Sequence, residues 1–355
     1  MRGERLGILG AGSWGTTLAV ILARAGRPVT LWARDAQAAN ALARSRENAR
    51  YLPGVDLPDE VRITASLEDA VAGADHLIVA VPSQGVRALA ARLASVIGPT
   101  QTVLSATKGI EAESGERMSQ ILAAHLPRTP VAVLSGPNIA NEVVRGLPTP
   151  TVVASSDPKV SGTFQSLVGT PTFRVYRNDD VVGVELAGAL KNVIALGAGA
   201  IDGLGYGGNA KAGFITRGLA EIARLGVAAG ANPLTFAGLA GFGDLVATCF
   251  SEHSRNRRAG EMLAQGLALP EIQARIGQVT EGVGTTLAAR RLSRESGVEM
   301  PIAQATYEVL FEGKPVRDAV LILMAREQTD ELSGPLAEFG RLFARLAGSE
   351  RVRGG

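Results

Sequence analysis

A glycine-rich turn close to the amino terminus constrains this chain more than any other feature. An apolar run at residues 6–9 leads directly into Gly10, Gly12 and Gly15, and a helical pattern follows at residues 16–25. Gly10 permits a tight turn, Gly12 lets a pyrophosphate approach the backbone, and Gly15 lets the helix pack on the strand. The pyrophosphate would meet the free N–H groups of the helix start. The pattern therefore predicts a dinucleotide site for NAD or NADP.

Apolar runs alternate with helical patterns through the first half of the chain. Strands are expected at residues 6–9, 29–32, 61–64, 76–81, 102–106, 131–134, 151–154 and 173–176. This alternation predicts an α/β fold, a Rossmann-type doubly wound sheet whose strands are mostly parallel. Polar or glycine-rich residues follow four of the runs, at 34–35, 82–84, 107–109 and 135–138. Because ligands bind at the carboxyl ends of such strands, these four corners should line one crevice.

The pattern becomes helical from residues 178–180 onward. Residues 180–200 are apolar almost all round, which is typical of a buried helix. We therefore expect a dinucleotide-binding Rossmann domain at 1–178 and an all-α C-terminal substrate domain at 180–355. Within the latter, residues 332–355 form a variable, basic tail with a weak amphipathic helix at 336–346.

Composition narrows the functional class of this 355-residue chain. A net charge of +2 gives no general attraction to nucleic acid or to an anionic membrane. The single Cys249 excludes an intramolecular disulfide, and the three histidines show no metal-ligand spacing. The uncharged stretch at 225–243 is interrupted by glycines and by Asn232-Pro233, which argues against a membrane span. With no signal peptide before the first strand, a soluble cytoplasmic enzyme without a metal is expected.

Two lysines are candidates for catalysis. Lys191 lies on the apolar helix, where an ammonium must extend to solvent, form an ion pair or face a polar cavity. It is either a structural lysine or a catalytic group beside a substrate oxygen. Lys108 follows the strand at 102–106 and is either a solvated loop residue or a substrate ligand at the cofactor crevice.

A second group of candidates lies in the helical half. Asp244 follows Gly241 and Gly243, and it is either a helix cap or a partner of the lysines. Ser254 is a good N-cap for a helix over residues 255–265. That helix start, with the guanidinium of Arg255, is either an ordinary capped turn or a cradle for a phosphate group.

Arg34 bears on the choice between NAD and NADP. It ends the second strand, where an acid usually binds the ribose hydroxyls of NAD, and an arginine there can hold the 2′-phosphate of NADP instead. Asp35 follows directly, so the sequence leaves the preference open.

Together these strings resemble the bacterial NAD(P)-dependent glycerol-3-phosphate dehydrogenases over about residues 5–330. The matching strings begin at Gly10 (GAGSWGT), Val81 (VPS), Ser105 (SATKGIE), Ser135 (SGPN), Leu190 (LKNV), Gly241 (GFGDL), Ser254 (SRNRR) and Thr280 (TEGV). They occur in the order and spacing of that family. One departure is Asn138-Ile139, where the family carries Ser or Thr followed by Phe.

The resemblance implies reduction of dihydroxyacetone phosphate to sn-glycerol 3-phosphate by NADH or NADPH, and the reverse, in a homodimer that supplies the glycerophospholipid backbone. By position, Lys191 matches the proton donor and acceptor, assisted by Lys108 and Asp244. The implied substrate contacts are Lys108, Gly136, Asn138, Lys191, Asp244, Ser254, Arg255 and Asn256. The implied cofactor contacts are Gly10, Gly12, Ser13, Trp14, Gly15, Arg34, Lys108, Ala140, Arg255, Val279 and Glu281.

Physical reasoning agrees with these roles. Hydride delivery to a ketone builds negative charge on its oxygen, which two ammonium groups would stabilise. Burial and the neighbouring cation should lower the pKa of Lys191 towards neutrality.

Two alternatives remain. One is a related lysine-using dehydrogenase of another phosphorylated or carboxylated hydroxy-substrate, which would not be expected to combine the string at Ser254 with the string at Gly241. The other is a non-catalytic dinucleotide sensor, against which Lys108, Lys191 and Asp244 argue.

Overall fold

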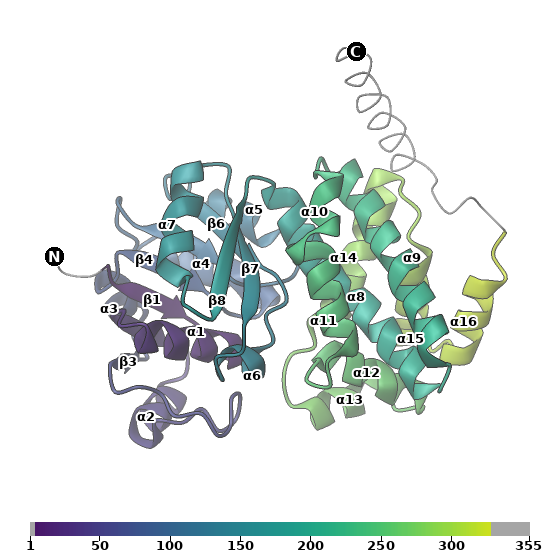
Figure 1. Cartoon of the computed structure of the whole chain (residues 1–355), viewed down its shortest axis with the longest axis horizontal. Coiled ribbons are helices and arrows are strands. Elements are labelled where there is room, and N and C mark those ends of the chain that lie inside the picture. Colours follow the sequence, from purple (N-terminus) through teal and green to yellow (C-terminus); the bar gives the residue numbers. More distant parts are fainter. Residues whose placement is uncertain (1–3, 328–355) are drawn as a thin grey trace, which may run out of the picture.

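The structure, a computed structural model, describes residues 4–327, and it has a sheet part followed by a helical part (Figure 1). Within these residues one sheet contains eight strands in the order β3-β2-β1-β4-β5-β6-β7-β8. The strands are β1 (Leu6–Leu9), β2 (Val29–Trp32), β3 (Val61–Thr64), β4 (His76–Val79), β5 (Thr102–Ser105), β6 (Val131–Ser135), β7 (Thr149–Ala154) and β8 (Phe173–Asn178). All neighbouring strands run parallel except β6 and β7. The order reverses between β1 and β4, the place where doubly wound sheets bind ligands.

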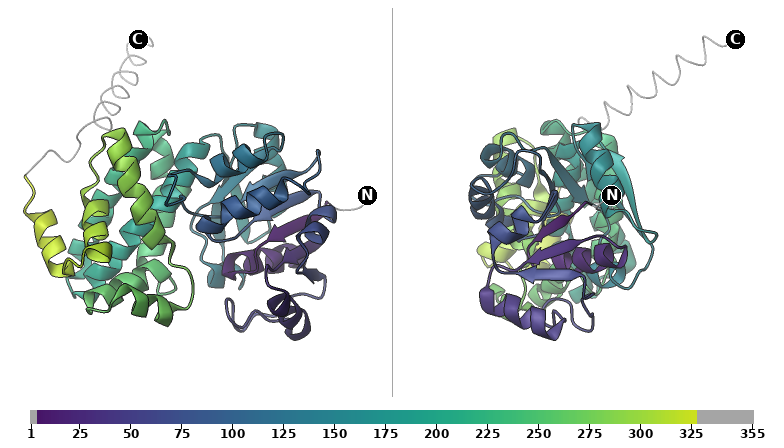
Figure 2. Two further views of the ribbon diagram at one scale, coloured as in Figure 1. Left: turned by 180° about the vertical axis from the view of Figure 1, so that it is seen from behind. Right: turned by 90° about the vertical axis from the view of Figure 1, so that its left-hand side faces the viewer.

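Helices cover both faces of this sheet (Figure 2). In the sheet part they are α1 (Ser13–Arg24), α2 (Ala36–Ser45), α3 (Leu67–Ala72), the 3₁₀ turn η1 (Ser83–Gly85), α4 (Val86–Leu93), α5 (Met118–His125), α6 (Ala140–Val143) and α7 (Pro158–Val168). Side chains of α1, α6 and α7 form a core with one face, and those of α3, α4 and α5 form a core with the other. The parallel strands are therefore buried on both sides, which explains their nearly continuous apolar sequences.

The helical part is built around α8 (Val181–Gly203). The remaining elements are α9 (Gly207–Ala228), α10 (Pro233–Ala237), the π-helix η2 (Leu239–Gly243), α11 (Asp244–Phe250), α12 (Arg255–Ala264), α13 (Leu269–Ile276), α14 (Glu281–Ser296), α15 (Pro301–Phe311) and α16 (Val316–Met324). Helix α8 packs against α9, α11, α12, α14 and α15. It is the one described helix long and apolar enough to span a membrane, and 83% of the relevant window is buried inside the protein. Its all-round apolar sequence therefore serves the centre of a helical core.

Most sequence expectations for local structure are confirmed, with small shifts at element ends. Helix α1 begins at Ser13, three residues before the predicted start, because the glycine turn leads directly into it. Strand β4 ends at Val79, since its pairing with β5 ends there. Ser254 is the N-cap of α12 as predicted, and Ser66 caps α3 in the same way; each hydroxyl accepts a backbone N–H. The helix predicted at 336–346 lies outside the described residues.

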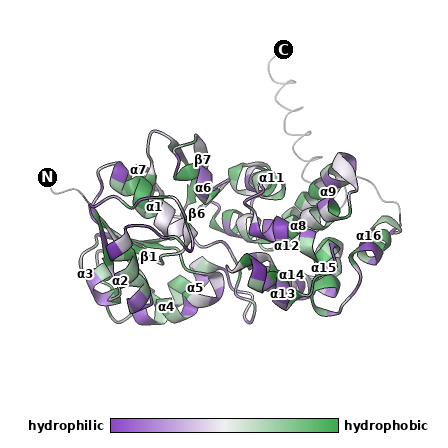
Figure 3. Cartoon of the chain, turned by 90° about the horizontal axis from the view of Figure 1, so that it is seen from below, coloured by the Kyte–Doolittle hydropathy of each residue, from purple (hydrophilic) through white to green (hydrophobic). Residues whose placement is uncertain are grey.

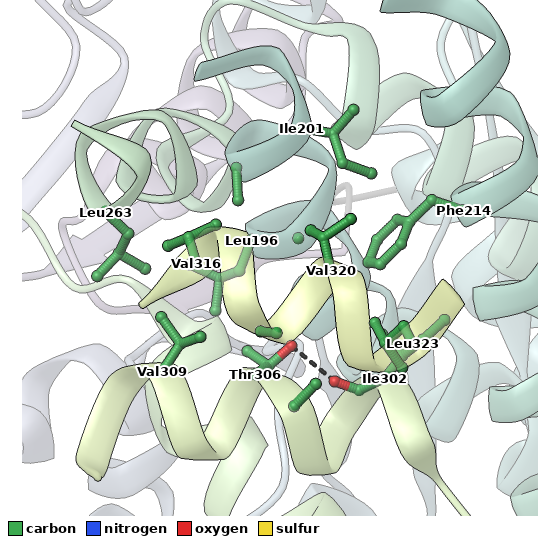
Figure 4. Close-up of a pocket in the computed structure, with 14 residues that line it drawn as sticks. Leu196, Ile201, Phe214, Leu263, Ile302, Thr306, Val309, Val316, Val320 and Leu323 are labelled. Carbon is green, nitrogen blue, oxygen red and sulfur yellow. Dashed lines mark hydrogen bonds between the residues drawn. The ribbon is translucent and has the colours of Figure 1, made fainter. Parts of the chain in front are cut away.

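An apolar hollow lies between α8 and the last described helices. Leu196 and Phe214 face Val316, Val320 and Leu323 across it (Figure 4). Among the described residues that line it there is no charged side chain, so it offers no acid, base or anion ligand.

Close contact between α8 and α12 depends on glycine. A Cβ at Gly199 would stand 1.8 Å from the carbonyl oxygen of Arg257, and one at Gly260 would stand 1.9 Å from that of Leu196. Only glycine allows the two helix backbones to approach this closely.

We predict that Gly199→Ala lowers the free energy of unfolding by about 2 kcal/mol or more, because overpacking forces two helices apart. Gly213→Ala is the control, since an added Cβ on this exposed α9 position meets no atom of the described part of the chain within 4 Å. It should raise stability by about 0.5–1 kcal/mol through helix propensity. Urea unfolding of both variants checks this, and equal effects would contradict the packing argument.

Candidate active site

The glycine turn after β1 has the geometry expected of a phosphate-binding loop. Gly10 has a φ of +122°, and a Cβ there would stand 2.6 Å from the Ala80 carbonyl oxygen. At Gly15 a Cβ would stand 1.9 Å from the Gly10 carbonyl oxygen, so the helix packs against the turn itself. Among residues 4–327, nothing lies within 4 Å of the corresponding point at Gly12, and no side chain caps the start of α1. An anion could approach this helix start through the open space over Gly12.

A buried cluster of three charges joins the sheet part to the helical part. Lys108, after β5, donates from Nζ to Asp244 Oδ2 at 2.7 Å and to the Gly136 carbonyl at 2.7 Å. Lys191 on α8 donates to the other oxygen, Oδ1, of Asp244. The Asp244 and Lys191 side chains are 2% and 6% exposed, and that of Lys108 is 18% exposed. Lys191 therefore does not extend to solvent, and the Asp244 carboxylate binds two ammonium groups instead of capping α11.

Thr248 is a fourth member of the cluster that sequence reasoning missed. Its Oγ1 accepts from Lys191 Nζ at 2.5 Å and donates to Asp244 Oδ1 at 3.3 Å. Asp244 and Thr248 are four residues apart on α11, so both project from the same face of the helix. This four-residue spacing is the sequence signal that points from Asp244 to Thr248.

The cluster carries two positive charges and one negative charge. Burial lowers the pKa of Lys191 to about 8; nearby Lys108 acts in the same direction, whereas Asp244 opposes the shift. Lys191 thus remains mostly protonated at pH 7 and can release its proton at mildly alkaline pH. The surplus positive charge suits a site that stabilises a developing oxyanion.

Two contacts of α8 fix the place of Lys191 relative to the sheet. A Cβ at Gly188 would stand 2.3 Å from Ser135 Oγ at the end of β6, so α8 lies directly against that strand end. Glu185 accepts hydrogen bonds from the backbone N–H of Ser119 at 2.8 Å and from Arg117 Nη1 at 2.6 Å, at the start of α5. The sheet part therefore holds the first turns of α8 on two sides.

The first turn of α12 lies beside α8 and is strongly hydrophilic (Figure 3). The Ser254 hydroxyl accepts the Arg257 N–H at 3.2 Å. Arg255 Nη1 donates to the Val279 carbonyl at 2.8 Å. Asn256 is buried, donating to Asn192 Oδ1 at 2.9 Å and accepting the Gly282 N–H at 2.9 Å. The structure thus groups Arg255 with Val279, and it joins Asn256 to α8 and α14.

Glu281 connects the helical part to the turn after β4. Its carboxylate accepts from the Ser83 N–H at 3.1 Å and from the Ser83 hydroxyl at 2.5 Å. Burial raises the pKa of Glu281, while Ser83 and the charge of Arg255 oppose that shift. Ser83 was not among the predicted site residues, although it belongs to the string at Val81.

The remaining predicted residues lie at other strand ends. Arg34 is exposed after β2, and Asp35 next to it caps α2 by accepting the Ala38 N–H at 2.7 Å. Asn138 donates to Thr151 Oγ1 at 3.0 Å, and its buried Oδ1 has no partner among the described residues. Ala140 starts α6 and packs on the core of α1. Trp14 Nε1 is likewise buried without a described partner.

Comparison with known proteins decides the family. The model of the NAD-dependent glycerol-3-phosphate dehydrogenase N-terminus matches residues 5–161, and the model of its C-terminus matches residues 180–321. The chain belongs to the NAD-dependent glycerol-3-phosphate dehydrogenase family. It is accordingly an oxidoreductase whose cofactor is NAD or NADP.

Individual relatives agree with this assignment. The enzyme is 50% identical over 330 residues to a glycerol-3-phosphate dehydrogenase (NAD(P)+) of Chlorobium limicola, covering 92% of this chain and 99% of that protein. It is 51% identical over 327 residues to the protein of the same name from Geobacter sulfurreducens, covering 91% and 98%. The crystal structure of glycerol-3-phosphate dehydrogenase from Coxiella burnetii superposes with a TM-score of 0.89 at 37% identity, covering 92% of this chain and all of that one.

The pKa of Lys191 predicts how stability depends on pH. An unfolded lysine keeps its proton up to about pH 10.5, whereas folded Lys191 keeps it only up to about pH 8. Between these values the unfolded state binds more protons, so this group makes the enzyme more stable as the pH rises.

We predict that Lys191→Met is more stable than the wild type at pH 7 by about 1–3 kcal/mol, because Lys108 still neutralises Asp244 and an apolar side chain suits the site. That advantage should shrink from pH 8 to pH 10.5. Urea unfolding of both proteins at pH 7, 8, 9 and 10 checks it, and a constant difference would contradict the lowered pKa.

Proposed function

We propose that this enzyme reduces dihydroxyacetone phosphate to sn-glycerol 3-phosphate with NADH or NADPH, and catalyses the reverse reaction. The observation that carries the proposal is the buried Lys108–Asp244–Lys191 cluster at the carboxyl edge of the sheet. The names of the bacterial relatives support the same reaction.

The glycine turn fits the pyrophosphate of the cofactor. The open space over Gly12 and the uncapped start of α1 leave backbone N–H groups for the phosphates, and Ser13 and Trp14 lie in that first turn. Arg34 is exposed directly after β2, which supports a contact with a 2′-phosphate, while Asp35 caps α2 through Oδ1. This arrangement favours NADPH while still admitting NADH.

The lysines act on the carbonyl oxygen of the substrate. The reduced nicotinamide supplies the hydride when it is bound. Lys108 and Lys191 stabilise the negative charge that develops on the oxygen, and Lys191 donates the proton that forms the hydroxyl. In the reverse direction Lys191 accepts that proton, which its pKa of about 8 permits. Asp244 keeps both ammonium groups in place through its two oxygens, and we also assign it a contact with a substrate hydroxyl.

Polar groups around the cluster would orient the rest of the substrate. The buried Oδ1 of Asn138, which has no partner within residues 4–327, can accept a hydroxyl, and the Gly136 carbonyl lies beside Lys108. We assign the phosphate to the start of α12, where Ser254 caps the helix and Arg255 adds a bidentate guanidinium. Asn256 belongs to the same turn and fixes its position.

The remaining cofactor contacts lie where the two parts meet. We assign Arg255, Val279 and Glu281 to the nicotinamide half together with Lys108 and Ala140. The Glu281–Ser83 contact supports this assignment because it brings the start of α14 to the turn after β4, and the Arg255–Val279 bond holds the start of α12 beside the same segment. The family resemblance also supports a homodimer that works in the cytoplasm and supplies glycerophospholipid synthesis.

The function is tested by following absorbance of the reduced nicotinamide with dihydroxyacetone phosphate as substrate. Lys191→Met should lower kcat by about 100-fold or more, the effect of removing a general acid. Lys211→Met is the matched control, because it removes another buried lysine, paired with Asp202 instead of Asp244. Its kcat should stay within about threefold of the wild type, as expected of a residue outside the reacting groups. Absence of turnover by the wild type would overturn the proposed function.

Arg255→Ala tests recognition of the phosphate. It should raise KM for dihydroxyacetone phosphate by about 10-fold or more, the loss of a charge-assisted hydrogen bond. Unphosphorylated dihydroxyacetone should be a very poor substrate for the wild type, because phosphate binding orients the carbonyl. Comparing kcat/KM for the two substrates decides the matter: an equal proportional loss would show that Arg255 does not bind the phosphate.

A further inference from the structure

Asn48 joins the loop after α2 to the glycine turn. Its side-chain Nδ2 donates to the Ala11 carbonyl oxygen at 3.0 Å and to Thr16 Oγ1 at 2.7 Å. An amide NH₂ has two hydrogens, and both are used here. The residue is only 9% exposed, so these bonds are sheltered from competing water.

The bond to Ala11 has a stereochemical consequence for Gly12. In a trans peptide the C=O of one residue and the N–H of the next point in opposite directions. By holding the Ala11 carbonyl, Asn48 therefore fixes the Gly12 N–H so that it points away from the loop. Because the space over Gly12 is open, the Gly12 N–H lies in the part of the turn that a phosphate can approach.

The loop holds Asn48 itself in place. Its backbone carbonyl accepts from the N–H groups of Tyr51 at 3.1 Å and Leu52 at 2.7 Å. Leu52 is fully buried in the core formed with α1. The backbone at Asn48 therefore cannot move away from the turn without displacing the packed side chain of Leu52.

We propose that Asn48 is a positioning residue for the cofactor, acting through the Ala11–Gly12 peptide on the pyrophosphate. The proposal rests on the dinucleotide site of the proposed function and extends it to a residue far from the glycine motif in sequence. Asn48 does not touch the reacting atoms, so its effect belongs to cofactor affinity and not to the chemical step.

The test replaces the donor with an acceptor of the same shape. Asn48→Asp places a carboxylate against the Ala11 carbonyl, which would turn the peptide. Gln101→Glu is the matched control: Gln101 is 7% exposed, and its Nε2 donates to the carbonyls of Val71 and Ala74, each at 2.7 Å, near the start of β5. Both variants should unfold at a lower temperature. Titration calorimetry with NADPH should show a Kd about tenfold above the wild-type value for Asn48→Asp and an unchanged Kd for Gln101→Glu. A tenfold rise is the size expected from losing one or two hydrogen bonds.

Saturating NADPH should restore the kcat of Asn48→Asp to within about twofold of the wild type, because the lysine cluster is untouched. If Asn48→Asp does not fold, Asn48→Ser, which is too short to reach Ala11, should show the same rise in Kd. An unchanged Kd in the variant that folds, or an equal rise in Gln101→Glu, would overturn the proposal. A wild type that fails to bind NADPH would instead overturn the proposed function, and this inference with it.

Discussion

One buried carboxylate holds the working parts of this enzyme together. Asp244 neutralises an ammonium group from the sheet part and another from α8, each through its own oxygen. Without Asp244, two buried cations would face each other with no counter-charge, which is among the least favourable arrangements in a protein interior. The same contact therefore stabilises the fold and forms the proposed active site. Lys108 and Lys191, which Asp244 joins across the sheet and helical parts, are the groups proposed to contact the substrate oxygen.

The precision of that contact depends on how closely helix α8 approaches its neighbours. Gly188 brings it against the end of β6, and Gly199 brings it against the first turn of α12. The lysine cluster and the proposed phosphate site thus lie along one helix, with Lys191 in its middle and Gly199 nearer its end. A substrate bound between them would find its carbonyl and phosphate partners already spaced, which lowers the entropic cost of reaction.

The sequence alone predicted the regular part of this picture. Apolar runs located the strands, and Ser254 marked the start of α12, because these signals are local. It also singled out Lys191, since an ammonium on an apolar helix requires an explanation. It could not decide whether the Lys191 ammonium extends to solvent or forms an ion pair. It also could not predict the contacts of Thr248, Ser83 or Asn48. Those depend on residues as many as 198 positions apart, which only the packed chain brings together.

The cap that Asp35 places on α2 limits how coenzyme preference can change in this enzyme. An acidic residue at the end of β2 ordinarily binds the adenosine ribose, and here one of the carboxylate oxygens of Asp35, Oδ1, also accepts the Ala38 N–H. Replacing Asp35 by an apolar residue would remove the cap and destabilise α2 by about 1 kcal/mol. A change of coenzyme preference through Arg34 would therefore cost less stability, because within the described residues its side chain makes no comparable helix-capping hydrogen bond. At this strand end, Asp35 is therefore constrained by the stability of α2, whereas Arg34 can be substituted without loss of that cap.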